Sequence, residues 1–109
     1  MQATDDLALV YTVCASEEEA LQISRAVVRE RLAACTNYWP IQSVYVWQGE
    51  LTEDTEVALI VKTTRARVPE VFDRIRAMHS YELPCLLELA PREAGPEYAD
   101  WIRRGSAGS

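Results

Sequence analysis

Histidine, cysteine and glycine are scarce in this chain of 109 residues, with one, three and four copies respectively, and each shortage excludes a class of site. The cysteines are widely spaced and form no Cys-x-x-Cys pair, so neither a disulfide framework nor a structural zinc site is indicated. Four glycines form no glycine-rich phosphate loop. The single histidine leaves no local pattern of a base beside a serine or cysteine nucleophile, and we therefore expect no enzymatic activity.

Basic residues and long apolar runs are scarce as well. Lys and Arg number 11 against 17 Asp and Glu, which gives a net charge of −6. Because this surplus repels phosphate backbones and anionic lipids, neither a nucleic acid nor a membrane is an expected partner. No apolar run approaches the roughly 18 residues of a membrane span, and the first residues lack the basic segment of a signal peptide. These features indicate a cytoplasmic protein.

The chain does contain enough apolar residues for one core. Hydrophobic residues make up 49% of the sequence, which fits a single domain over residues 1–109. We expect residues 1–6 and the small, polar tail 105–109 to be flexible. At this length, burial against another chain would add stability.

The strongest structural signal is a long β-hairpin. Residues 44–48 form its first arm, Gly49 its turn and residues 53–64 its second arm. The second arm spans roughly 40 Å if fully extended at about 3.3 Å per residue, whereas a typical strand has about 5–6 residues. This arm is therefore predicted to overhang its own domain.

Helix signals flank the hairpin. A capping box that begins at Ser16, with Glu three positions later, predicts a helix over residues 16–34. Apolar residues at helical spacing after an early proline predict a second helix over residues 68–79. A strand at residues 85–89 and a short helix at residues 95–102 complete the pattern.

This order, with a first strand at residues 7–14, indicates an α+β fold of the ferredoxin-like βαββαβ type, in which both long helices cover one face of an antiparallel sheet. Residues 7–14 and 57–61 are almost continuously apolar, which predicts burial on both faces. We therefore expect further copies of the same chain to cover the second face in a closed cyclic assembly. Periodicity alone leaves open whether there are two or three subunits.

Four stretches of the chain resemble the CutA divalent-cation tolerance family, and the resemblance spans nearly the whole chain, from about Leu7 to Ile102. They are residues 10–19, 30–35, 56–64 and 81–84. The resemblance implies a ferredoxin-like homotrimer with sheets packed inward and hairpin arms that reach onto neighbouring subunits. It also implies a role in divalent-cation tolerance, with copper or another divalent cation weakly bound and a signalling role.

The resemblance places copper binding around His79, the only histidine, with Cys14 nearby in the fold. A thiolate and an imidazole suit copper or zinc, and the carboxylate of Glu82 completes a three-ligand set. Cys14 precedes a capped helix N-terminus, which can lower the pKa of a thiol. The alternatives are that His79 complements the negative end of the second helix and that Cys14 is simply buried.

The other two cysteines carry weaker signals. Cys85 is a further candidate thiolate, or else a small buried side chain in a strand. Cys35 follows a pair of alanines at the end of the first helix, where packing explains it.

A second candidate site is an aromatic and basic lining of a cleft between subunits. Its residues are Lys62, Trp47, Tyr81, Tyr98 and Trp101. This set is the basis of an alternative function, a regulatory trimer similar to PII proteins that binds a small anionic ligand in such clefts. The same aromatic residues can instead be packing anchors in a purely structural trimeric scaffold.

Overall fold

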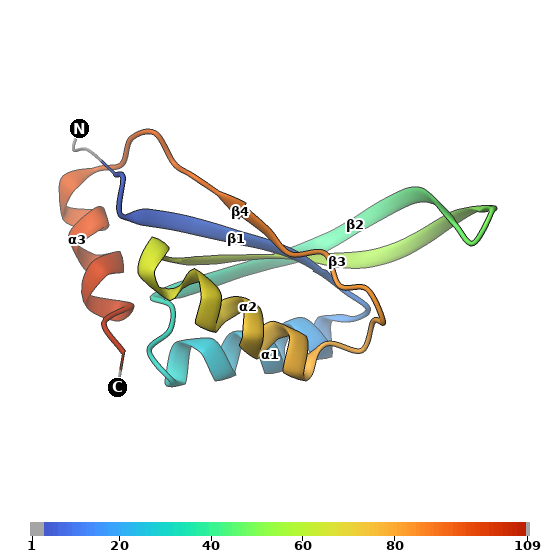
Figure 1. The fold of residues 1–109 in the computed structure, drawn as a ribbon, viewed down its shortest axis with the longest axis horizontal. Coiled ribbons are helices and arrows are strands. Elements are labelled where there is room, and N and C mark those ends of the chain that lie inside the picture. Colours follow the sequence, from blue (N-terminus) through green and yellow to red (C-terminus); the bar gives the residue numbers. More distant parts are fainter. Residues whose placement is uncertain (1–3, 109) are drawn as a thin grey trace.

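The computed structural model describes residues 4–108, which form four strands and three α-helices (Figure 1). The elements follow the order β1 (Leu7–Cys14), α1 (Glu17–Arg29), β2 (Cys35–Trp47), β3 (Glu50–Thr64), a 3-10 turn (Arg65–Arg67), α2 (Val68–Met78), β4 (Leu87–Leu89) and α3 (Pro96–Gly105). The strands form one antiparallel sheet in the order β2-β3-β1-β4. The ferredoxin-like α+β fold predicted from the sequence is confirmed.

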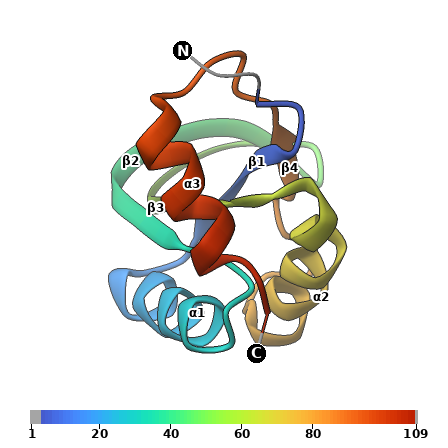
Figure 2. The ribbon, with the colours of Figure 1, turned by 90° about the vertical axis from the view of Figure 1, so that its left-hand side faces the viewer.

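Helices α1 and α2 lie side by side against one face of the sheet (Figure 2). Each is amphipathic and directs its apolar side chains at every second residue of β1 and β3. The core between these layers is fully buried and consists mainly of aliphatic residues: Val10, Ile23, Val27, Leu59, Val61, Val71 and Ile75.

Helix α1 ends at Arg29, not near Ala34 as predicted. Arg31 has a φ of 58°, and the amides of Arg31 and Leu32 donate hydrogen bonds to the carbonyls of Val28 and Val27. This is a Schellman motif, which terminates a helix by placing one residue in the left-handed region. Glycine usually occupies that position, and the arginine here explains why no glycine marks the end of the helix.

The first arm of the hairpin is much longer than the predicted residues 44–48. Strand β2 begins at Cys35, and β3 begins at Glu50 instead of residue 53. Pro40 lies inside β2, where a proline normally argues against a strand. It is tolerated because β2 is an edge strand, so the missing N–H interrupts no central ladder.

The hairpin overhangs the rest of the sheet, as predicted. β1 pairs with β3 only between Val57 and Thr64, so residues 41–56 have no third strand beside them. This projection accounts for the long axis of the molecule, 45 Å against 27 and 21 Å (Figure 1). At its tip Gln48 and Gly49 have φ values of 51° and 82° and form a two-residue turn.

The face of the sheet opposite α1 and α2 stays partly uncovered, and we call it the open face. Cross-strand pairing places on it Leu9, Tyr11, Trp39, Ile60, Leu87 and Leu89. Trp39, Leu87 and Leu89 are 41%, 52% and 42% exposed. The bare apolar face expected from the order of elements is therefore present.

Strand β4 and helix α3 differ slightly from their predicted bounds. β4 is limited to Leu87–Leu89, whereas α3 extends to Gly105. Ala99 and Ile102 of α3 pack against Leu7 at one end of the sheet. In the described part of the chain no helix is both long and apolar enough to cross a membrane.

Both ends of the described chain form hydrogen bonds with the domain, and the expected flexibility of residues 1–6 and 105–109 stays a prediction. Thr4 is buried and its hydroxyl donates to the carbonyl of Pro91 at 2.5 Å. At the other end Arg67 donates to the carbonyls of Ser106 and Ala107 at 3.0 and 2.7 Å. Residues 1–3 and 109 lie outside the described residues.

Candidate metal-ligand cluster and neighbouring cavity

Three potential metal ligands meet where β1, α1 and α2 come together. Cys14 ends β1, Glu19 lies in the first turn of α1 and His79 follows the last residue of α2. One ligand atom from each residue lies within 4.8 Å of the other two. The fold therefore brings a thiol, a carboxyl and an imidazole group together from three elements.

Glu19 holds this corner of the molecule together. Its amide donates to the Ser16 hydroxyl at 3.1 Å, which confirms the predicted helix cap. Its carboxylate accepts hydrogen bonds of 3.1 Å from the amides of Ala15 and Ser80 and lies 3.6 Å from Nδ1 of His79. Burial acts to raise the pKa of Glu19, but the bonds from Ser80 and Ala15 and the nearby His79 outweigh it and lower this pKa.

Both ring nitrogens of His79 have partners. Nε2 lies 2.7 Å from the carbonyl of Val13, and the amide of Tyr81 donates to Nδ1 at 3.0 Å. A carbonyl accepts and an amide donates, so these contacts assign the proton to Nε2 of a neutral ring. The imidazole has no exposed surface.

Cys14 is a neutral thiol in this environment. Burial, followed by the nearby charge of Glu19, raises its pKa to about 12. This direction is opposite to the lowering expected from the helix N-terminus, because loss of solvation outweighs the helix dipole at a fully buried sulfur.

Of the three predicted ligands, the structure brings His79 and Cys14 together and leaves Glu82 apart from them. Glu82 is exposed and lines a cavity on the other side of Tyr81. Sequence reasoning interpreted Glu19 only as a capping residue. One signal could have identified Glu19 as a ligand. It is a carboxylate in the first turn of a helix that directly follows a cysteine at the end of a strand.

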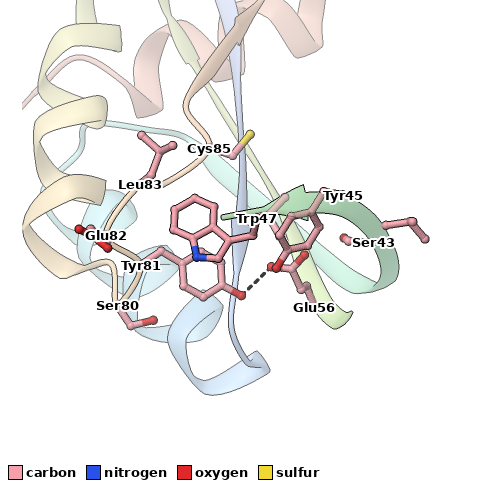
Figure 3. Close-up of a pocket in the computed structure, with 11 residues that line it drawn as sticks. Ser43, Tyr45, Trp47, Glu56, Ser80, Tyr81, Glu82, Leu83 and Cys85 are labelled. Atoms are coloured by element: carbon pink, nitrogen blue, oxygen red, sulfur yellow. Dashed lines mark hydrogen bonds between the residues drawn. The ribbon is translucent and has the colours of Figure 1, made fainter. Parts of the chain in front are cut away.

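That cavity has a volume of about 750 Å³ and lies between the stem of the hairpin and residues 80–85 (Figure 3). In it Tyr81 donates to the carboxylate of Glu56 at 2.6 Å. On the same hairpin Tyr45 donates to Asp54 at 2.5 Å. Burial and the bond to Glu56 raise the pKa of Tyr81, and the bond to Asp54 raises that of Tyr45 to about 12.

The predicted intersubunit cleft residues fall into two separate groups. Trp47 and Tyr81 line the cavity. Lys62 instead donates to the hydroxyl of Tyr98 at 3.2 Å, and Tyr98 stacks on Trp101 with ring centroids 5.5 Å apart, at the α3 end of the sheet. Within one chain these five residues do not form one site.

The remaining cysteines have different surroundings. Cys85 is half-buried and lines the cavity, and burial and then Glu56 raise its pKa. Cys35 is half-buried at the start of β2. Cys14, Cys35 and Cys85 are all free thiols.

The class of protein is defined by a ferredoxin-like domain with an overhanging hairpin, an open apolar sheet face and a Cys-Glu-His cluster. A family model described as CutA1 divalent ion tolerance protein matches residues 8–105. The chain therefore belongs to the CutA1 divalent ion tolerance family.

Three relatives agree with this assignment over nearly their whole length. The divalent-cation tolerance protein CutA of Thermus thermophilus is 43% identical over 99 residues, which cover 90% of this chain and 96% of that protein. The solved structure of CutA from Synechococcus elongatus is 37% identical, with a TM-score of 0.93 over 96% of this chain and 94% of that chain. The periplasmic divalent cation tolerance protein CutA from Archaeoglobus fulgidus has a TM-score of 0.90 at 37% identity, over 92% and 98% of the two chains.

Proposed function

We propose that this protein is a cytoplasmic homotrimer that binds copper or another divalent cation weakly and acts in divalent-cation tolerance, with a signalling role. The observation that carries the metal-binding part is the cluster of Cys14, Glu19 and His79. Sulfur, imidazole nitrogen and carboxylate oxygen together form a donor set that suits copper or zinc.

The donors fit such an ion in kind, but each has to change state to bind it. The Cys14 thiol must lose its proton, and a bound cation would drive that loss. His79 must give up either the bond from the Tyr81 amide or the bond to Val13. These two costs explain why the affinity should be weak and should fall as the pH falls.

Metal titration of the intact protein tests this proposal. Calorimetry with Zn²⁺, and anaerobically with Cu²⁺, should show binding that Cys14→Ser and His79→Gln each weaken by about tenfold or more. Glu82→Gln, which removes an exposed carboxylate outside the cluster, is the matched control and should bind as the wild type does. Unchanged affinity in folded Cys14→Ser protein would remove the cluster from the metal site.

Trimer formation is supported by the apolar surface that one chain leaves exposed. The open face and the hairpin both carry large exposed apolar side chains, among them Leu87, Val46 and Leu51. Closed symmetry is the usual way to bury such surface, and the resemblance to the family favours three copies.

The alternative function, an anion-binding regulatory trimer, is less well supported. Among the described residues, 4–108, the cavity is lined by the carboxylates of Glu56 and Glu82 and by no lysine or arginine, so it does not suit an anion. The cytoplasmic location is supported by three unpaired thiols.

A further inference from the structure

We propose that the cavity between the hairpin stem and residues 80–85 binds a small organic ammonium ion with an apolar or aromatic body. This site is distinct from the metal-ligand cluster, and its occupant differs in charge from the anion of the regulatory alternative. The argument rests on the origin of the lining residues, their charge and their aromatic rings.

The floor of the cavity comes from one face of the hairpin. Ser43, Tyr45 and Trp47 are alternate residues of β2 and therefore share a face. Cross-strand pairing of Ile41 with Glu56 places Glu56 on that same face of β3. A regular two-stranded ribbon thus holds these side chains in a fixed arrangement.

The wall comes from the segment that joins α2 to β4. The side chains that form this wall are those of Tyr81, Glu82, Leu83 and Cys85 (Figure 3). The Tyr81–Glu56 hydrogen bond ties the wall to the floor across the cavity. The volume of about 750 Å³ falls within the range of roughly 300–1,000 Å³ for small-molecule sites.

The charge of the lining is negative. Glu56 and Glu82 are its ionisable carboxyl groups, and no basic side chain among residues 4–108 lines it. Glu56 is only 6% exposed, and its one hydrogen-bond donor in the described chain is the neutral hydroxyl of Tyr81. A largely buried carboxylate without a cationic partner is unfavourable, and a ligand ammonium group would supply that partner.

The aromatic rings select an organic cation over a bare metal ion. Tyr45, Trp47 and Tyr81 bring three aromatic rings to the lining, and aromatic faces attract ammonium groups. Val13 and Leu83 add apolar surface for the body of the ligand. A hard metal ion would instead require several oxygen ligands in place of these rings.

The test compares two probes with the same ring and opposite charges, 2-phenylethylammonium and phenylacetate, titrated calorimetrically into the assembled protein at fixed ionic strength. The first should bind and the second should not. Glu56→Gln keeps an acceptor for Tyr81 but removes the charge, and it should weaken 2-phenylethylammonium binding at least tenfold. Glu53→Gln removes one carboxylate from an exposed position of the same strand that does not line the cavity, and it should leave binding unchanged.

Trp47→Leu provides a second variant in case Glu56→Gln does not fold. Trp47 is 41% exposed, so its replacement should preserve the fold while it weakens ammonium binding.

The proposal is overturned if phenylacetate binds as well as 2-phenylethylammonium, or if Glu53→Gln and Glu56→Gln have equal effects. Absence of binding to the intact assembly at millimolar concentration also overturns it, because a neighbouring subunit would then close the cavity. None of these outcomes affects the metal titration, since Glu56 and Trp47 lie outside the metal-ligand cluster.

Discussion

The carboxylate of Glu19 connects three parts of the molecule through two hydrogen bonds and one close approach to an imidazole ring. It accepts from Ala15 before α1 and from Ser80 after α2, and it approaches His79. A carboxylate that accepts amide hydrogen bonds is stabilised in its charged form. Glu19 therefore links the stability of this corner to pH.

We predict that Glu19→Gln lowers the free energy of unfolding by about 1–3 kcal/mol at neutral pH, because one of its two amide donors then faces the side-chain NH₂. The folded-state pKa of Glu19 is below its usual 4.5, so its contribution is complete above pH 4.5 and is lost as the pH falls through the lower folded value. Chemical denaturation at several pH values should show a steeper acid loss in the wild type than in the variant. Equal acid profiles would contradict the role of the carboxylate.

Cys14 makes the free energy of unfolding depend on pH in the opposite direction, with a loss of stability at high pH. Its folded pKa of about 12 exceeds the unfolded value of about 9, so its contribution is complete below pH 9 and is lost as the pH rises toward 12. We expect the free energy of unfolding to fall by up to about 1.4 kcal/mol per pH unit in this window because of Cys14. Cys14→Ala should remove that part of the slope, whereas Cys35→Ala retains it.

At the scale of single residues, the sequence predicted which residue types lie near one another but not their protonation states. The proximity of Cys14 and His79 followed from the family resemblance. Their protonation did not, because it depends on the Val13 carbonyl and the Tyr81 amide, which no sequence pattern identifies.

Among the elements, residues other than glycine in the left-handed region account for the missed end of α1 and for part of the hairpin turn. Arg31 ends α1 without a glycine signal, and Gln48 shares the hairpin turn with Gly49. Strand β1 and helix α2 were well predicted, because apolar periodicity and an early proline specify them. The first arm of the hairpin is longer than predicted, and Pro40, a residue that normally argues against a strand, lies within it on an edge strand.

We predict that Gln48→Asn stabilises the hairpin. A left-handed conformation costs an ordinary residue roughly 1–2 kcal/mol, and Asn before Gly is the preferred sequence of this turn. The expected gain is about 0.5–1 kcal/mol in denaturant unfolding at equal protein concentration. Gln48→Val, which places a β-branched residue in the same conformation, should destabilise, and a gain from this control would refute the turn argument.

On the scale of the whole molecule, the open face and the projecting hairpin determine how the chain associates. The order of elements was sufficient to predict that one sheet face lacks helices. It was insufficient to predict the number of copies, because that number depends on contacts between chains.

We predict a particle with three times the 12.3 kDa mass of the chain in sedimentation equilibrium. Leu87→Glu places a charge on the open face, at its edge strand β4, and should shift the protein toward smaller species at micromolar concentration. Val28→Glu, at an exposed apolar position of α1, is the matched control and should remain assembled. A stable wild-type species of 12.3 kDa would exclude the trimer.

The described chain starts and finishes at the same end of the molecule, beside α3 and opposite the tip of the hairpin (Figure 1). Fluorescent proteins or surface tethers fused to either end would thus be carried far from the hairpin tip. Two differently coloured preparations could be mixed and energy transfer between them recorded, which would measure how fast chains exchange between particles.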